Sequence, residues 1–218
     1  MKRTGRALES IYATLHAGYG PQHWWPGDTP FEVMVGAVLT QNTAWSNVEK
    51  AIANLVSEDL LDPGKITSVR KDYLARRLRP SGYFNIKAGR LRHFCRWYLE
   101  SGGYRSLRRL PTDELRHALL SVHGIGPETA DDILLYAFLR PVFVIDAYTR
   151  RLFSRLGLIA GDEPYETLRM MFEQGLGPDV ELFNEYHALI VRHAKNICRT
   201  RPVCSGCMLR PRCPSVQI

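Results

Sequence analysis

Four cysteines lie close together near the end of this chain and constrain its fold more than any other feature. Cys198, Cys204, Cys207 and Cys213 are separated by five, two and five residues. A loop this short cannot bury a hydrophobic core of its own, so a metal centre or disulfides must hold it in place. A [4Fe–4S] cluster takes one cysteine per iron, and four thiolates in one loop suit it.

Two alternatives to the iron–sulfur cluster stay open at this point. Zinc sites built from four cysteines usually pair two C-x2-C units, and this loop contains only one. Disulfides require an oxidising compartment, but no apolar stretch typical of a secretion signal follows Met1. We therefore expect a cytoplasmic protein with reduced thiols, in which Cys95 is an ordinary core residue.

The charge of the chain indicates a polyanionic partner. Its 29 Lys and Arg residues outnumber 22 Asp and Glu residues, which gives a net charge of +7. Arginine supplies most of the positive charge, and its guanidinium group binds phosphate through two hydrogen bonds. Nucleic acid is the obvious partner, although a basic surface alone is the simpler alternative. No run of about 18 apolar residues is present, so we expect no membrane association.

Apolar residues recur at helical spacing along most of the chain. Leu8, Ile11, Tyr12 and Leu15 form the first such stripe. The segment 142–145 is rich in β-branched residues but is too short to demand a sheet. The pattern predicts an all-α protein of about ten helices, with further helical segments at residues 31–39, 48–55, 73–78, 88–99, 112–122, 128–139, 148–156, 165–174 and 182–197.

The segment 120–130 predicts a tight turn between two helices. Gly124 and Gly126 flank Ile125, and Pro127 opens the second helix. Glycine allows a left-handed turn and a close approach of phosphate, while the unpaired N–H groups of the new helix attract an anion. This is the pattern of a helix–hairpin–helix, which grips the DNA backbone without reading sequence. A glycine-rich helix turn without that function is the alternative.

Asp146 follows the apolar segment 142–145 and precedes a predicted helix. The simplest interpretation is a helix N-cap. The functional interpretation is a carboxylate held at the start of a helix, close to the phosphate backbone that the hairpin binds.

In combination, these motifs resemble the endonuclease III branch of the helix–hairpin–helix DNA glycosylases over nearly the whole chain. The resemblance implies a two-lobed all-α fold, with a six-helix barrel at residues 22–140 that ends in the hairpin. Residues 1–21 and 141–218 would form a second, discontinuous lobe with a [4Fe–4S] loop at 198–213. It also implies a monomer that binds double-stranded DNA containing a damaged base, nucleoid-associated if the source is bacterial.

The resemblance also assigns roles to individual residues. Asp146 would be the catalytic carboxylate. The segments 39–43 and 82–88 look like the DNA-wedging segments of the family, in which Gln41 would fill the gap left by an everted base. The predicted DNA-binding residues are Gln41, Asn42, Tyr83, Lys87, Gly124, Ile125, Gly126 and Thr129.

Two departures from the family pattern carry information. Bifunctional members have a lysine in the second hairpin helix that forms a Schiff base, whereas the matching residue here is Glu128, which cannot form an imine. We therefore expect a monofunctional glycosylase. The first gap between cysteines is also one residue shorter than the commonest family spacing.

The expected substrate follows from aromatic residues near the N-terminus. The segments 23–26 and 38–45 are similar to the 3-methyladenine-DNA glycosylase III group, which predicts a base pocket of Trp24, Trp25, Pro26, Trp45 and Glu128. Indole faces attract a cationic alkylated purine. A tryptophan pair that merely packs on the core is the structural alternative. Functional alternatives are a uracil, thymine-mismatch or oxidised-base glycosylase, and a non-catalytic iron–sulfur protein that binds damaged DNA.

Overall fold

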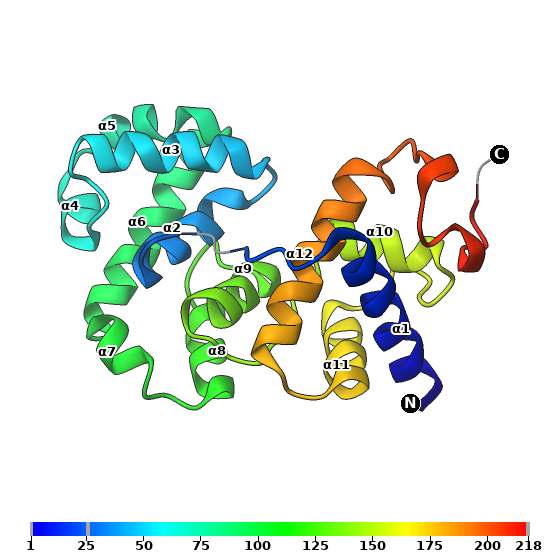
Figure 1. The fold of residues 1–218 in the computed structure, drawn as a ribbon. Helices are drawn as coiled ribbons and strands as arrows, with labels where there is room; N and C mark the ends of the chain where they lie inside the picture. The colour runs from blue at the N-terminus through cyan, green and yellow to red at the C-terminus, as the bar shows by residue number, and fades with distance from the viewer. Residues whose placement is uncertain (1, 25–26, 217–218) are drawn as a thin grey trace. The chain divides into compact units, whose positions relative to one another are not determined.

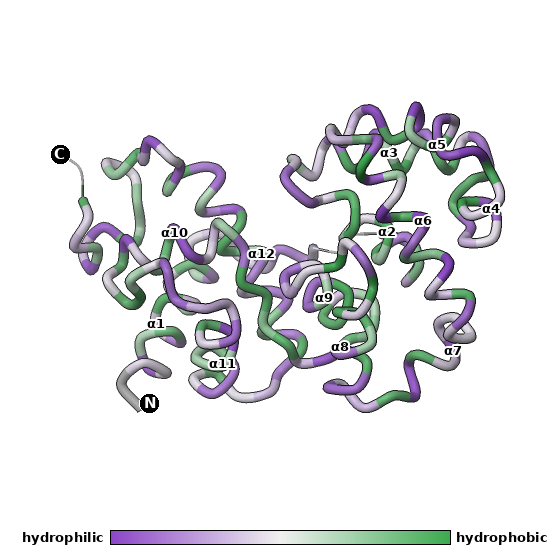
Figure 2. The backbone as a smooth tube through the Cα atoms, turned by 180° about the vertical axis from the view of Figure 1, so that it is seen from behind, coloured by the Kyte–Doolittle hydropathy of each residue, from purple (hydrophilic) through white to green (hydrophobic). Residues whose placement is uncertain are grey.

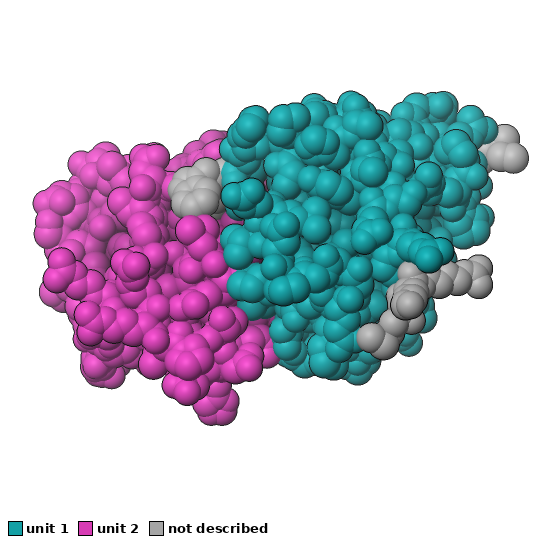
Figure 3. Space-filling model, turned by 60° about the horizontal axis from the view of Figure 1, so that its bottom comes forward, with its two compact units in different colours: residues 1–24, 141–218 teal, residues 25–140 magenta. Residues whose placement is uncertain are grey.

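The computed structural model describes residues 2–24 and 27–216, in which every regular element is helical. The predicted all-α class is therefore confirmed (Figure 1). The chain divides into two compact units: unit 1 comprises Met1–Trp24 and Pro141–Ile218, and unit 2 comprises Trp25–Arg140 (Figure 3).

Unit 2 contains the first long run of consecutive helices. Its core helices are α2 (Pro30–Thr40), α3 (Trp45–Ser57) and α6 (Phe84–Glu100). The hairpin predicted at 120–130 joins α8 (Thr112–Leu120) to α9 (Pro127–Asp132), as the positions of the glycines indicated. The remaining elements are α4 (Pro63–Ser68), α5 (Lys71–Arg77), the 3₁₀ turn η1 (Arg79–Ser81), α7 (Gly103–Leu107) and the π-helical turn η2 (Ile133–Ala137).

Unit 1 is built from both ends of the chain. The first helix, α1 (Lys2–Tyr19), packs against α11 (Tyr165–Leu176) and α12 (Val180–Asn196), and α12 also packs against α10 (Ala147–Arg155). Two short 3₁₀ turns, η3 (Cys204–Gly206) and η4 (Arg210–Arg212), lie in the cysteine loop.

Local sequence signals explain where several of these helices begin. Thr29 caps α2 by accepting the Glu32 N–H at 3.1 Å, and Asp179 caps α12 by accepting the Leu182 N–H at 3.0 Å. Proline occupies the first helical position of α2, α4 and α9, where its missing N–H costs nothing. The alternation of apolar and polar residues along the helices can be followed in Figure 2.

Buried apolar residues fill the interior of each unit. In unit 2, α2 is buried along nearly its whole length, from Val33 to Leu39. In unit 1 the core is aromatic. The Phe143 ring stacks on that of Phe172 with a centroid distance of 4.4 Å, and it meets the Phe183 ring edge-on with a centroid distance of 5.3 Å. Phe143 belongs to the extended segment 142–145, which is fully packed but pairs with no strand in the described residues.

The helix predicted at 128–139 differs from the observed one in a single respect. After α9 the chain continues as the π-helical turn η2, in which the Phe138 N–H bonds the Ile133 carbonyl at 3.2 Å. Leu139 then adopts a left-handed backbone with φ of 54°, which ends the helix. Periodicity does not separate a π turn from an α-helix, because both bury the same apolar residues.

No helix in residues 2–24 and 27–216 is long and apolar enough to cross a bilayer.

The hairpin is fastened by a buried ion pair between its two helices. Arg116 of α8 donates Nε–H to Asp131 Oδ1 at 2.7 Å and Nη2–H to Oδ2 at 3.2 Å. The Asp131 side chain is 0% exposed, and this bidentate contact offsets part of the cost of burying its charge.

We expect Arg116→Leu to lower the free energy of unfolding by about 3 kcal/mol, because it withdraws the guanidinium from a buried carboxylate. Urea denaturation followed by circular dichroism measures this effect. The control is Arg76→Ala, which breaks an exposed i,i+4 pair with Asp72 whose side chains are both 57% exposed. We expect it to change the unfolding free energy by under about 0.5 kcal/mol. Equal effects of the two variants would contradict a structural role for the buried pair.

Candidate functional site

Asp146 caps α10 from a nearly buried position. Its Oδ1 accepts the Thr149 N–H at 2.7 Å, as the N-cap interpretation of the sequence predicted. Its Oδ2 lies 3.5 Å from Nε2 of His187 on α12, and the Asp146 side chain is 12% exposed. A local cap and a contact from a distant helix therefore share one carboxylate.

The surroundings of Asp146 favour its ionised form. Burial raises the pKa of Asp146, but His187 and Thr149 lower it by more, so the pKa lies below the ordinary value of 3.8. The group is a carboxylate at neutral pH, able to stabilise a positive charge or to accept a proton from water.

The hairpin turn has the geometry that its glycines predicted. Gly124 has a left-handed backbone with φ of 93°, and Ile125 is 6% exposed because it plugs the turn into the core. A Cβ on Gly124 would lie 2.4 Å from Cγ of Arg90, so no other residue fits there without displacing that side chain. Gly126 is exposed and precedes α9, whose first-turn N–H groups have no acceptor within the helix.

Gln41 is joined to the hairpin by its own side chain. Its Nε2 donates to the Gly124 carbonyl and to Oγ1 of Thr129, each at 3.0 Å. Arg90 donates in turn to Oε1 of Gln41. The segment after α2 and the hairpin are therefore one hydrogen-bonded network within unit 2. In this arrangement the Gln41 amide is engaged with protein groups, whereas the following Asn42 is exposed with φ of 54°.

Lys87 ties the two predicted wedging segments together. It is 1% exposed and donates Nζ–H to the Leu39 carbonyl at 2.8 Å and to the Ser81 carbonyl at 2.6 Å. Burial lowers the pKa of Lys87 to about 8, while the two carbonyls favour the protonated amine. Its amine thus faces the protein interior. Tyr83 is the exposed residue of this turn, with 68% of its surface accessible and φ of 45°.

Of the tryptophans predicted for the base pocket, Trp24 lines a pocket and Trp45 packs against a helix. Trp24, in unit 1, lines a pocket of about 280 Å³ together with Gln22 and α12 residues that include Arg192, Lys195 and Asn196. Trp45, in unit 2, begins α3 and covers Gly36 of α2 so closely that a Cβ there would lie 2.9 Å from the ring. Trp25 and Pro26 lie outside the described residues.

Glu128 stands in the first turn of α9 and is exposed. A carboxylate in this position interacts favourably with the positive end of the helix. Its neighbours Pro127 and Thr129 carry no amine, so this turn offers no nucleophilic nitrogen side chain.

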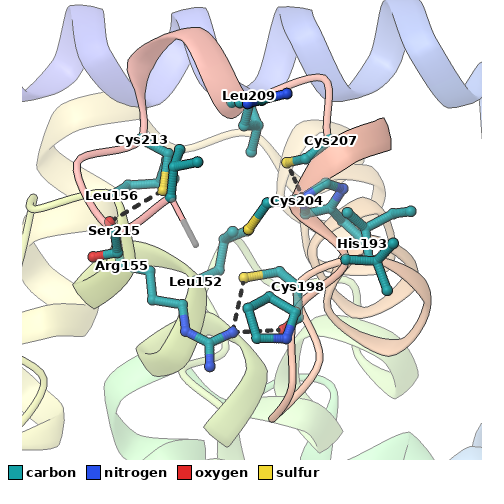
Figure 4. Close-up of a pocket in the computed structure, with 15 residues that line it drawn as sticks. Leu152, Arg155, Leu156, His193, Cys198, Cys204, Cys207, Leu209, Cys213 and Ser215 are labelled. Atoms are coloured by element: carbon teal, nitrogen blue, oxygen red, sulfur yellow. Dashed lines mark hydrogen bonds between the residues drawn. The ribbon is translucent and has the colours of Figure 1, made fainter. Parts of the chain in front are cut away.

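The four cysteines line one pocket in the C-terminal loop. Its apolar wall includes Leu152, Ile197 and Leu209 (Figure 4). The Cys198 thiol accepts a hydrogen bond from Nη1 of Arg155 at 3.3 Å. The same guanidinium group also bonds the carbonyls of Arg199 and Thr200, so it fixes the loop that follows α12.

The electrostatics of this pocket fit a cationic centre between the thiols. Burial raises the pKa of Cys207, and the charges of Cys198, Cys213 and Cys204 raise it further. Four thiolates would repel one another here unless iron or another cation lay among them. Within residues 2–24 and 27–216, no three His, Cys, Asp or Glu side chains are placed to hold a single metal ion.

Sequence reasoning missed three residues of these sites: Arg90, His187 and Arg155. Arg90 stands one helical turn after Lys87, and this spacing is the one signal that could have placed it beside the wedging segments. His187 is a polar residue within the apolar stripe of α12, which marks it as buried but does not identify its partner.

Comparison with known proteins places these sites in a family context. Residues 35–178 match the HhH-GPD superfamily of base excision DNA repair proteins. A protein of Methanocaldococcus jannaschii, provisionally named a DNA repair glycosylase, is 48% identical over 95% of this chain and 96% of its own length. Endonuclease III of Thermotoga maritima is 30% identical over 84% of this chain and 82% of its own length.

Solved structures agree with the sequence comparison. The H. pylori 3-methyladenine DNA glycosylase MagIII, bound to 1,N6-ethenoadenine, is 31% identical, covers 88% of this chain and 97% of its own, and has a TM-score of 0.75. An endonuclease III–DNA complex has a TM-score of 0.83 at 20% identity over 97% and 95% of the two chains, which supports the fold alone.

Proposed function

Because this chain belongs to the HhH-GPD superfamily of base excision DNA repair proteins, it is a DNA N-glycosylase, and from this premise we propose that it hydrolytically releases alkylated purines such as 3-methyladenine. The single observation that carries the proposed chemistry is the ionised, nearly buried Asp146 carboxylate at the start of α10.

In the proposed reaction, Asp146 acts on the sugar of a flipped nucleotide. An alkylated purine leaves readily, so the C–N bond lengthens toward a positively charged, oxocarbenium-like sugar. The Asp146 carboxylate stabilises that charge and orients or deprotonates the attacking water. Its lowered pKa supports this role, because the group stays anionic at neutral pH.

We propose that the unit 2 network grips and opens the DNA. Gly124 and Gly126 would bind backbone phosphate, since their N–H groups carry no side chain that would block its approach. Exposed Tyr83 and Asn42 stand in the segments that would enter the base stack. Lys87 would hold these segments in place from the interior and would not contact DNA itself.

Glu128 supports a monofunctional mechanism. Bifunctional relatives require an amine at this position, and a carboxylate cannot form an imine with the sugar. Lys87 offers no substitute, because its amine is buried between two carbonyls.

The choice of alkylated purines rests on Trp24 and on the MagIII relationship. A pocket of about 280 Å³ beside an indole has room for a stacked base. Arg192 and Lys195 in the same wall suit phosphate better than a cationic base, so the indole face would provide the attraction to the base itself. MagIII, at 31% identity, binds an adenine derivative, which favours purines for this chain.

We propose further that Cys198, Cys204, Cys207 and Cys213 hold a [4Fe–4S] cluster. The donor set provides one thiolate per iron, and all four thiols line one pocket. The cluster would act as a structural staple for a loop that carries Arg199, Arg201, Arg210 and Arg212.

We expect the purified protein to release 3-methyladenine from methylated duplex DNA and Asp146→Asn to lose this activity by about 100-fold or more, because the amide carries no charge. Chromatography of the free bases measures release across a panel of lesions. Asp179→Asn is the matched control, since it alters another aspartate N-cap of unit 1 and should leave the rate unchanged. Release of only uracil or thymine from mismatches would refute the assignment of alkylated purines as the substrate. Binding of DNA without release of any base would refute the enzyme mechanism.

We expect no covalent enzyme–DNA adduct when the reaction is treated with borohydride, because Glu128 has replaced the Schiff-base lysine. Glu128→Lys should restore a trapped complex visible on a denaturing gel. Efficient trapping by the wild-type protein would contradict the monofunctional mechanism, and its loss in Lys195→Ala would identify the amine responsible.

We expect about four iron atoms per chain and a brown colour in protein purified without oxygen. Cys204→Ala should lose the iron, whereas Cys95→Ala should retain it, since Cys95 is a fully buried core residue whose pKa is raised by burial. Elemental analysis that finds one zinc and no iron would overturn the cluster assignment.

A further inference from the structure

The two oxygens of Asp146 are held by elements far apart in sequence. The Thr149 N–H fixes Oδ1 at 2.7 Å within α10. Oδ2 faces His187 Nε2 at 3.5 Å across the packed α10 and α12 helices. At this distance Nε2 makes no hydrogen bond to Oδ2 in the structure, but contacts of catalytic groups often tighten only when substrate is bound.

The imidazole is well placed to act as a fixed support. The His187 side chain is 7% exposed. Its neighbour Tyr186 is 0% exposed, and its ring packs edge-on against the rings of Phe143 and Phe153, with centroid distances of 5.9 Å and 6.2 Å, which anchors this turn of α12. The histidine therefore faces Asp146 from a rigid part of unit 1.

The N-cap bond alone does not define the carboxylate plane. The terminal torsion of aspartate is broad, so one hydrogen bond leaves the second oxygen free to swing. A catalytic carboxylate that faces a developing sugar cation must keep one direction of approach and its full negative charge. A proton on Nε2 of His187 serves both needs, because it attracts Oδ2 and favours the ionised carboxylate.

We propose that His187 is the positioning residue for Asp146, orienting its Oδ2 through a proton on Nε2 so that the carboxylate meets the sugar in its anionic form. This proposal rests on the proposed function, in which Asp146 acts on the sugar. His187 does not touch the reacting atoms and acts only through Asp146.

Two variants of His187 separate positioning from simple packing. His187→Leu fills the site without a donor, and His187→Gln returns an N–H group near the place of Nε2. Tyr186→Phe is the control, because it removes a buried hydrogen bond from the same turn of α12 and leaves Asp146 untouched.

The first measurement is the single-turnover rate of base release against pH. Since His187 lowers the pKa of Asp146, His187→Leu should move the acid limb of the profile to higher pH. Its rate at neutral pH should fall about 10- to 100-fold. His187→Gln should recover part of the rate and part of the shift in the acid limb, and Tyr186→Phe should keep the wild-type profile. Binding to abasic-site DNA should be unchanged in all three variants.

The second measurement does not depend on activity. A ¹³C NMR titration of Asp146, assigned by the signal that Asp146→Asn lacks, should show a higher pKa in His187→Leu than in the wild type. An unchanged pKa would overturn the positioning role even if the protein released no base from any lesion. Conversely, full activity of Asp146→Asn would refute the proposed function, while the titration would still decide whether His187 controls this carboxylate.

Discussion

The site depends on the stabilisation of one nearly buried carboxylate, that of Asp146 at the start of α10. Removing a carboxylate from water costs several kcal/mol unless its surroundings replace the lost hydration. The Thr149 N–H and the His187 imidazole provide that replacement and keep the pKa of Asp146 below its ordinary value. The aromatic core of unit 1, including Phe143 and Tyr186, keeps the helices that carry these groups in register.

In unit 2, buried hydrogen bonds hold exposed turns in left-handed backbone conformations. Tyr83 and Asn42 have left-handed backbones that cost free energy, and such residues persist only where the surroundings enforce them. Lys87 restrains both turns by donating to the Leu39 and Ser81 carbonyls, and Gln41 connects the first turn to the hairpin by donating to the Gly124 carbonyl. If the hairpin binds phosphate as proposed, a shift of the hairpin would also move the segments proposed to enter the base stack, because the same hydrogen bonds connect them.

The cysteine loop is also held in place by polar side chains from neighbouring helices. It has little apolar surface of its own, so Arg155 binds its carbonyls and one of its thiols. His193, which is 0% exposed, lies 3.5 Å from the Cys207 thiol and links the loop to Tyr19 of α1 at 2.9 Å. The loop is thereby attached to both ends of the chain that form unit 1.

Sequence alone determined the features that depend on local chemistry. Helical periodicity gave the all-α class, the glycines of residues 124–126 gave the hairpin, and Asp146 read correctly as an N-cap, because each depends on residues within one or two turns. Tertiary structure decided the rest. That Lys87 faces inward, that Gln41 bonds the hairpin and that His187 faces Asp146 all depend on helices packing across 41 or more positions of sequence, and neither spacing nor composition encodes which side chains then meet.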